Sequence, residues 1–436
     1  MTGPCLIAGP NFSGRSRALT EILKDEGRGD QSFYVGPYAE SGLSGIATTV
    51  AEELAFYRFA GGATEHDAGL AHTEVTDTIL ARPSQRVATL SGGEQTLLAL
   101  LCFDSSRYRL LGVDTALEQL DSANRCSVLR YLLRLEHSER KCWLIDNRDL
   151  RQISVRRTID LEGSGAFALD FERLINAPPR GTAPTIEMRS LAFAYSATVP
   201  VFSDVSLTIH GGRAYRLNGP NGSGKTTFLK LLAGAVSPTG GAIYLDGKAY
   251  TPYWRGNEVL AWAMQDPDHQ WVSTSVEGDL AVKIKAFKGR RYARVPQNLD
   301  IESWIACFGI VDSAHNHLLD LPKAVRKRLS WLWPLSGVLP WIALDEPTLG
   351  QDRETTRRLA RTLGHFVAQG IGLLFVTHDD EFAELLSHET LVFGRHTVTI
   401  GRGPVSPVHG CSSHAAGVLL SGASSAGGDQ ATKESR

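Results

Sequence analysis

Short apolar runs alternate along the chain with segments of mixed polarity, and glycine-rich turns follow two of the runs. PCLIAGP (4–10) leads through a glycine loop into RALTEILK (17–24), and AYRLNGP (214–220) leads through a second loop into FLKLLAG (228–234). Apolar strands that alternate with amphipathic helices indicate an α/β fold with a mostly parallel sheet. We therefore predict one strand–loop–helix unit near the start of each half.

Other landmarks recur in the same order in the two halves. RLLGVD (109–114) corresponds to WIALD (341–345), and both read as buried strands that end in aspartate. LSGGEQ (90–95) and LPKAVR (321–326) lie equally far before those aspartates. We therefore predict tandem α/β domains, each with a mostly parallel sheet and flanking helices. The boundaries that we assign are a first domain at 1–176, a linker at 177–184, a second domain at 185–405 and a disordered tail at 406–436.

Composition and charge narrow the class of protein. The chain has 436 residues, 42% of them hydrophobic and 21% charged, and its formal net charge is −2. A protein that coats nucleic acid normally carries a basic excess, so we expect no nucleic-acid partner. No apolar stretch approaches the roughly 18–20 residues that cross a bilayer. We expect a cytosolic protein that does not itself span a membrane.

The second glycine loop carries nucleotide chemistry. Residues 219–226 fit GxxxxGK[ST], the Walker A pattern, in which backbone N–H groups and the following helix cradle phosphates. Lys225 should reach the β- and γ-phosphates of ATP, and Thr226 and Asp345 should hold Mg²⁺. Glu346 is placed to polarise the attacking water. Gln265 is expected to sense the metal and the γ-phosphate, which His378 should also contact. The expected phosphate-binding residues are Gly219, Asn221, Gly222, Ser223, Gly224, Lys225, Thr226 and Thr227.

These spaced motifs resemble the nucleotide-binding domain of ABC ATPases, in which LSGGEQ is the signature motif. The resemblance implies tandem P-loop domains of the ABC type, each with a helical signature subdomain. The resemblance implies two domains in head-to-tail contact, with ATP between the Walker A loop of one and the signature of the other. It therefore places Ser91, Gly92, Gly93 and Gln95 of the first half at the second half's ATP. The same resemblance implies that Tyr195 stacks on adenine and that Asp121 serves the site from across the interface. A core tyrosine on an edge strand is the alternative for Tyr195.

In the arrangement that the resemblance implies, each ATP site combines residues of both halves. The departures from the family pattern all belong to one of these two sites. In the first half Arg15 replaces the Walker A lysine, Thr115 stands where the second half has Glu346, and Asn147 stands for the histidine. The first half also lacks residues for the strand that carries the adenine-stacking aromatic. LPKAVR lacks the serine and glycines of a signature. We expect one hydrolytic site and one degenerate site, which either binds nucleotide weakly or is empty. The degenerate site comprises Gly9, Asn11, Gly14, Arg15, Ser16 and Asp114.

The loop after Gln265, with QDPDHQ (265–270) and TSVEGDL (274–280), resembles that of energy-coupling factor (ECF) importer ATPases. This likeness implies an energy-coupling subunit, peripheral at the cytoplasmic face of the plasma membrane, that powers uptake of a vitamin or metal micronutrient. Its partners would be an integral membrane T component, docked near 264–280 and 38–54, and a substrate-binding membrane subunit. The acidic segments are alternatively only solvated helix starts. The alternatives for function are the ATPase of another ABC transporter, or an ABC ATPase that acts on ribosomes or DNA.

Overall fold

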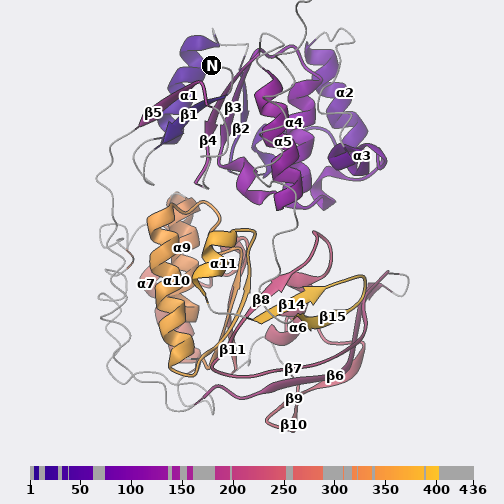
Figure 1. Ribbon diagram of the computed structural model, residues 1–436, viewed down its shortest axis with the longest axis vertical. Coiled ribbons are helices and arrows are strands. Elements are labelled where there is room, and N and C mark those ends of the chain that lie inside the picture. The colour runs from indigo at the N-terminus through magenta and orange to yellow at the C-terminus, as the bar shows by residue number, and fades with distance from the viewer. Residues whose placement is uncertain are drawn as a thin grey trace, which may run out of the picture.

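The computed structural model shows the chain as two bodies (Figure 1). The first contains strands β1–β5 with helices α1–α5, and the second contains β6–β15 with α6–α11. None of the described helices is long and apolar enough to cross a membrane. The structure describes residues 4–8, 15–27, 32–37, 39–61, 74–135, 140–147, 155–160, 182–196, 199–251, 259–287, 308, 317–321, 323–335, 339–386 and 389–401.

The first body is built on a parallel sheet of order β2-β3-β4-β1-β5. Its strands are β1 (Cys5–Ala8), β2 (Ser32–Val35), β3 (Leu110–Asp114), β4 (Lys141–Ile145) and β5 (Arg157–Asp160). Its longer helices are α1 (Arg15–Glu26), α2 (Val50–Gly61), α3 (Glu74–Leu80), α4 (Gly92–Asp104) and α5 (Ser122–Leu135). All five β3 residues are buried, as expected for a strand covered on both faces.

Glycine lets α1 approach this sheet closely. A Cβ added to Gly112 in β3 would lie 2.6 Å from a Leu23 methyl carbon, so α1 packs directly over the strand. Helices α2 and α3 pack against α4, and α4 is buried along most of its length. The close packing of α1 places Arg15, its first residue, near Asp114 at the carboxyl end of β3.

The second body has a sheet of order β11-β12-β13-β8-β14-β15, in which only β15 is antiparallel. Apart from β15, the order matches the first sheet strand for strand: both place the strand before the glycine loop fourth and the aspartate-ending strand second. The predicted α/β fold, with a parallel sheet and flanking helices, is confirmed. The strands are β8 (Ala214–Asn218), β11 (Leu260–Ala263), β12 (Trp341–Asp345), β13 (Gly372–Val376), β14 (Glu389–Phe393) and β15 (Val398–Gly401).

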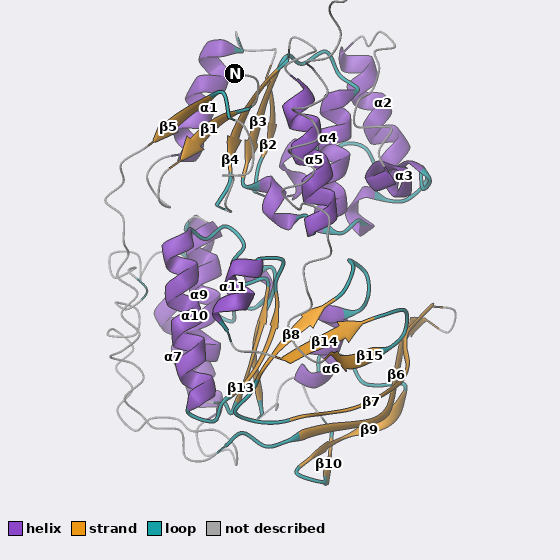
Figure 2. Ribbon diagram, in the orientation of Figure 1, coloured by secondary structure: helices purple, strands orange, loops and turns teal. Residues whose placement is uncertain are grey.

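Two apolar cores cover the two faces of this sheet. One lies toward helices that Figure 2 shows beside the sheet, namely α7 (Val276–Phe287), α9 (Lys323–Leu335), α10 (Arg353–Ala368) and α11 (Asp380–Leu385). The other includes α6 (Lys225–Ala233) and an antiparallel sheet of order β10-β9-β6-β7. That sheet consists of β6 (Ile186–Ser196), β7 (Val199–Ile209), β9 (Gly240–Leu245) and β10 (Lys248–Tyr250). The described part of the first body has no counterpart of it.

Several predictions fall on residues that the structure does not describe. The first glycine loop (9–14), Pro322, the end of the first predicted domain (161–176), most of the linker (177–181) and the chain beyond 401 lie outside the described residues. The predicted disorder of 406–436 therefore stays a prediction.

Candidate functional site

The loop between β8 and α6 needs glycine at three positions. Gly222 and Gly224 have φ of 77° and 99°, in the left-handed region that residues with a Cβ rarely adopt. A Cβ on Gly219 would lie 2.7 Å from the carbonyl oxygen of Phe393. The hydroxyl of Ser223 is buried without a partner among the described residues. A phosphate oxygen would satisfy that hydroxyl, so the loop fits the ligand that its sequence predicts.

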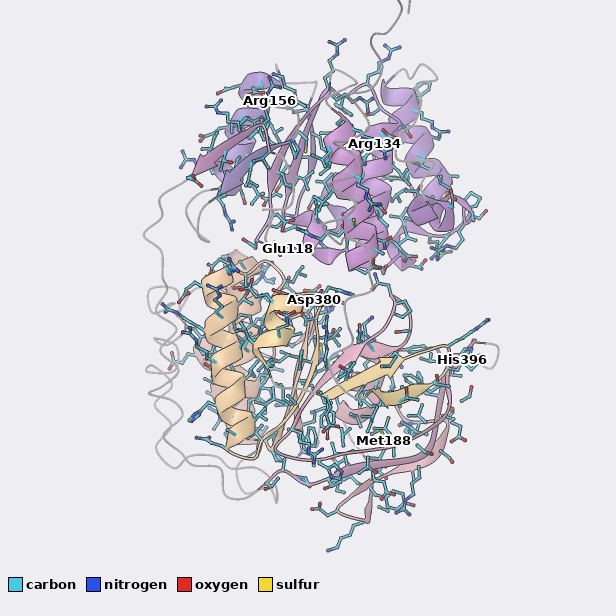
Figure 3. The ribbon with its side chains drawn as sticks, in the orientation of Figure 1. Glu118, Arg134, Arg156, Met188, Asp380 and His396 are labelled. Carbon is cyan, nitrogen blue, oxygen red and sulfur yellow. The ribbon has the colours of Figure 1, made fainter. Side chains whose placement is uncertain are left out.

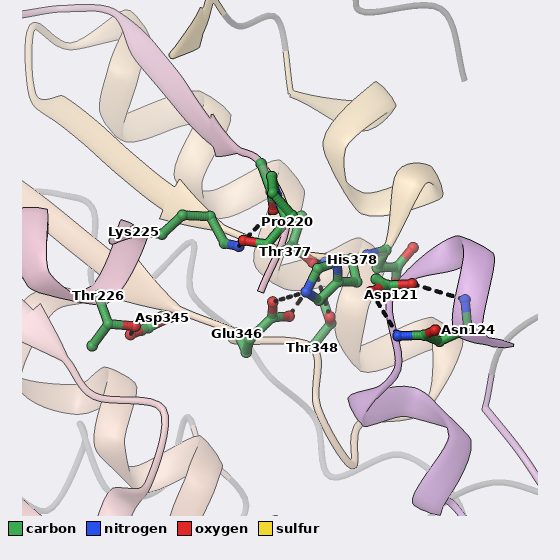
Figure 4. Close-up of polar contacts among 12 residues, drawn as sticks. Asp121, Asn124, Pro220, Lys225, Thr226, Asp345, Glu346, Thr348, Thr377 and His378 are labelled. Carbon is green, nitrogen blue, oxygen red and sulfur yellow. Dashed lines mark hydrogen bonds and ion pairs between the residues drawn. The ribbon is translucent and has the colours of Figure 1, made fainter. Parts of the chain in front are cut away.

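Lys225 begins α6 and folds back over the loop (Figure 4). Its Nζ donates to the carbonyl oxygens of Gly219 at 2.7 Å and Pro220 at 3.0 Å. The side chain is buried, and desolvation lowers its pKa against the opposing effect of Glu346, Asp345 and Asp121. The ammonium is thus held at the mouth of the loop, near carboxylates of both bodies.

A hydroxyl and a carboxylate meet below this lysine. Thr226 Oγ1 donates to Oδ2 of Asp345, at the end of β12, over 2.9 Å. Burial, together with the neighbouring charge of Glu346, raises the pKa of Asp345 to about 6. A buried carboxylate beside a hydroxyl is an oxygen donor set that suits Mg²⁺, whose charge would offset the burial of the carboxylate.

Glu346 is held at a turn by two backbone contacts. Its φ is 48° and its N–H donates to the carbonyl oxygen of Val376 over 3.0 Å, which ties the turn to β13. The N–H of His378 donates to Oε2 of Glu346 over 3.3 Å, and Nε2 of the histidine lies 3.4 Å from Oε1. The sequence placed both residues in the site, and the structure brings their side chains together.

Tyr195 and Gln265 are the other two side chains of the second body that the sequence predicts at this site. Tyr195, on β6, is 58% exposed and its hydroxyl lies 3.2 Å from Oγ1 of Thr227, which puts an open aromatic face beside the Walker A helix. Since β6 is an inner strand and the ring is exposed, the alternative of a core tyrosine on an edge strand is wrong. Gln265 has an exposed side chain, and its carbonyl oxygen accepts from Lys327. The predicted contact of its amide with the metal site stays a prediction.

The first body's signature segment faces the second body's Walker A loop. Ser91 caps α4 through a reciprocal capping box with Glu94, and Gln95 Nε2 donates to the carbonyl oxygen of Val87 over 3.1 Å. A Cβ added to Gly93 would lie 3.0 Å from the carbonyl oxygen of Gln119 and 3.3 Å from Nδ2 of Asn221, so a side chain there would force its neighbours to shift. The helix N-terminus, beginning at Gly92, therefore lies beside the predicted phosphate loop.

Asp121 approaches the same site from the segment after β3. Its charge acts on Lys225, and its carboxylate accepts from Asn124 N at 2.8 Å and Asn124 Nδ2 at 2.9 Å. Figure 4 shows Asp121 and Asn124 opposite His378 and Glu346. The two bodies thus bring Gly93 and Asp121 of one close to Asn221 and Lys225 of the other.

Sequence reasoning missed Lys327, a lysine that is 3% exposed in α9. Its Nζ donates to three carbonyl oxygens, those of Met264 at 2.9 Å, Gln265 at 2.8 Å and Asp345 at 2.9 Å. It therefore joins the end of β11 to the end of β12 beneath the site. The basic run KAVRKR (323–328) contains this lysine but does not tell which of its charges is buried.

We expect Lys327→Met to lower the free energy of unfolding by about 3 kcal/mol, because three buried carbonyl oxygens lose their donor. Chemical denaturation monitored by tryptophan fluorescence measures the loss. The matched control is Lys285→Met, at an exposed lysine of α7, which should change stability by less than about 0.5 kcal/mol. Equal losses in the two variants would contradict the role of the buried amine.

The corresponding side of the first body is built differently. Arg15 begins α1 and is 9% exposed; desolvation lowers its pKa against the effect of Glu118, Asp114, Asp352 and Asp146. Asp114 accepts a hydrogen bond from the hydroxyl of Tyr34 over 3.0 Å. Ser16, predicted to sit near Asp114, is exposed, and Gly9, Asn11 and Gly14 lie outside the described residues.

The backbone of this side nevertheless repeats that of the other. Thr115 has φ of 55° and its N–H donates to the carbonyl oxygen of Ile145 over 2.8 Å, as Glu346 does to Val376. On the opposite face, α9 begins at Lys323, where α4 begins at Gly92. The two sides therefore share a framework and differ in the side chains that it carries.

A parallel sheet with a Walker A loop and a strand-terminal Asp–Glu pair defines a P-loop ATPase. Within that class, the sequence model of the family "ABC transporter" matches residues 202–349. An ABC transporter ATP-binding protein of Streptomyces coelicolor is 30% identical over 241 residues, which is 52% of this chain and 83% of that protein. The chain belongs to the ATP-binding proteins of ABC transporters, which hydrolyse ATP to drive transport.

Further relatives and one solved structure extend the comparison. The HMP/thiamine import ATP-binding protein YkoD of Bacillus subtilis is 26% identical over 359 residues, 70% of this chain; the chain spans 64% of its length. The energy-coupling factor transporter ATP-binding protein EcfA1 of Thermotoga maritima is 29% identical over 202 residues, 46% of this chain and 74% of that protein. A chain of ribosome-bound archaeal Pelota and ABCE1 matches with a TM-score of 0.67 over 91% of this chain and 74% of its own, at 18% identity, which shows the fold alone.

Proposed function

We propose that the chain hydrolyses ATP at one composite site and thereby powers an ECF-type importer of a vitamin or metal micronutrient. In this proposal, residues 1–176 are a degenerate ABC ATPase domain and residues 185–405 a second one with complete Walker motifs. The observation that carries it is the approach of Gly93 in the first body to Asn221 in the second. The matching strand order of the two parallel sheets supports a tandem origin.

ATP would lie between the Walker A loop of the second body and the N-terminus of α4. Lys225 would exchange its bonds to Gly219 and Pro220 for bonds to the phosphates, because a charged acceptor binds an ammonium more strongly than a carbonyl does. Tyr195 would offer its exposed face to adenine. Thr226 and Asp345 would hold Mg²⁺, which when bound neutralises phosphate charge.

Glu346 is the group that we assign to polarising the attacking water. Its left-handed turn and the N–H of His378 fix the direction of the carboxylate. His378 lies beside the same carboxylate, so both side chains act at one point. At the other side Thr115 and Asn147 offer no such group, and we propose that hydrolysis is confined to the Lys225 site.

Two matched apolar positions favour a membrane partner. Ile46 and Phe56 in the first body correspond in sequence to Val272 and Val282 in the second, and the four are 77%, 40%, 59% and 52% exposed. Beside the first pair, a cavity of about 550 Å³ opens between α2 and α3, with Leu54, Phe59 and Leu80 in its wall. An exposed apolar pair on each body would suit a partner that presents two amphipathic helices, one to each body.

We therefore propose an integral membrane T component as the partner on these surfaces, together with a substrate-binding membrane subunit. The chain would then be peripheral at the cytoplasmic face of the plasma membrane. Relatives named for thiamine, cobalt and energy-coupling factor import support this assignment.

The test is purification of the tagged chain from detergent-solubilised membranes of its own cells. We expect an integral membrane T component to co-purify with the unaltered chain, with or without the substrate-binding subunit. Phe59→Asp, at a 92% exposed side chain, should reduce recovery of the T component at least about fivefold. Ile400→Asp, at an exposed residue of β15, is the matched control and should leave recovery unchanged. Recovery of ribosomes instead, or equal recovery with both variants, would contradict the proposed partner.

A further inference from the structure

Glu118 is a buried carboxylate that joins the two bodies. It lies in a short 3₁₀ turn (Ala116–Gln119) after β3 and is 4% exposed. Its Oε2 accepts from the N–H of Gly350 in the second body over 2.8 Å, and its Oε1 accepts from the N–H of Asn147 over 3.1 Å. Figure 3 shows Glu118 at the edge of the first body that faces the second.

The same type of contact occurs in the other site with a different carboxylate. Asn147 and His378 stand at the same separation from their strand-terminal aspartates, Asp114 and Asp345. The N–H of His378 donates to Glu346, whereas the N–H of Asn147 donates to Glu118. In the degenerate half, Thr115 stands where the other half has Glu346. Glu118, three residues further on, binds the corresponding backbone N–H, that of Asn147.

Gly350, the residue of the second body that binds Glu118, follows Glu346 closely along the chain. Segment 346–352 begins with Glu346 and includes Thr348, whose hydroxyl lies 3.3 Å from that of Thr377, next to His378. From its own body the segment is held by Gln351, which accepts from Arg328 Nε over 2.7 Å and donates to the carbonyl oxygen of Ala324 over 3.1 Å. Glu118 holds the residue before Gln351 from the opposite side.

The surroundings of Glu118 suit an ionised carboxylate. Two backbone donors bind it, and the Arg15 guanidinium is close enough for Glu118 to be its strongest electrostatic partner. A buried carboxylate with donors and a counter-charge is stable, whereas one left without them is costly. The arginine in the lysine position therefore has a role that needs no nucleotide.

We propose that Glu118 is a positioning residue for ATP hydrolysis: by binding the Gly350 N–H, it holds segment 346–352 so that Glu346 and His378 face the attacking water. The inference rests on the proposed function, since it acts through the Glu346 site. In the absence of this bond the segment keeps its anchors to α9 but loses its hydrogen bond to Glu118 of the first body. The degenerate half thus supplies both the signature segment (90–95) that faces ATP and a residue, Glu118, that raises the rate of ATP hydrolysis.

Steady-state ATPase assays on the full chain test this role. For Glu118→Ala we expect kcat to fall about tenfold or more, the size expected for one lost bond to a charged group, with the KM for ATP within about twofold. Glu118→Gln keeps the size and one acceptor oxygen, so its loss should be smaller. Hydrogen exchange of the peptide that spans 346–352 should quicken in Glu118→Ala, and the melting temperature of the Gln variant shows that the fold is retained.

Two kinetic outcomes overturn the inference. An unchanged kcat in both variants overturns it, even if hydrogen exchange quickens, and so does a raised KM with an unchanged kcat. Glu346→Gln, assayed in parallel, separates this failure from failure of the proposed function. If that variant still turns over ATP normally, the proposed catalytic site is wrong. If it is inactive while Glu118→Ala is normal, only the positioning role is wrong.

Discussion

Replacing Glu346 by glutamine should lower steady-state phosphate release about 100- to 1,000-fold, because the carboxylate that polarises water is lost while size and shape are kept. Lys225→Ala should have an effect of similar size, since no other described ammonium or guanidinium lies in the second glycine loop. Arg15→Ala should retain about half or more of the turnover. The bonds of Glu118 to Gly350 and Asn147 do not include the arginine, and this limits the loss.

Assay of the three purified variants at saturating ATP and Mg²⁺ measures this asymmetry. Binding of a fluorescent ATP analogue is the control, because Glu346→Gln should still bind nucleotide whereas Lys225→Ala should bind it poorly. Equal damage from Arg15→Ala and Lys225→Ala would contradict the assignment of one hydrolytic and one degenerate site.

The second large effect is expected at Gly93, which belongs to the first body but borders the loop of the second. Gly93→Asp should reduce turnover at least about 100-fold. Its Cβ would lie 3.0 Å from the carbonyl oxygen of Gln119 and 3.3 Å from Nδ2 of Asn221, and its negative charge would face the phosphates. The helix N-terminus can then no longer approach the nucleotide. Phosphate release under saturating ATP provides the measurement.

Ala324→Asp is the matched control for that variant. Ala324 stands in the second body where Gly93 stands in the first, so the proposed head-to-tail arrangement puts it at the degenerate site. The same added charge there should leave most of the turnover. Normal activity of Gly93→Asp would mean that the bodies do not form a composite site, and equal loss in the two variants would mean that the degenerate side is needed for hydrolysis.

The sequence alone predicted those parts of the site in which a local motif dictates the geometry. The Walker A loop follows from Gly219, Gly222 and Gly224, whose backbone or surroundings exclude a side chain. The Thr226–Asp345 pair follows from the parallel order of β8, β13 and β12, which places the ends of these strands at one edge. Duplicated motifs in one order likewise foretold two sheets of matching strand order.

Long-range contacts of ordinary residues could not be foretold. Glu118 lies in the LEQLD stretch, where nothing local distinguishes it from an exposed acid; its bond to Gly350 needs the second body. Lys327 is one of several basic residues at the start of α9, and only the packed helix shows that it points toward Met264 and Asp345. The exposed side chain of Gln265 shows the converse, since a motif position does not by itself fix a rotamer.

Thr115 keeps the left-handed turn that Glu346 uses, although a threonine contributes no carboxylate there. A β-branched residue in this conformation costs of the order of 1 kcal/mol, and the bond to Ile145 holds it in place. The turn therefore belongs to the architecture of the strand end and not to hydrolysis. An asparagine or glycine at this position would relieve the strain, which makes it a place where thermostability can be engineered without replacing a catalytic side chain.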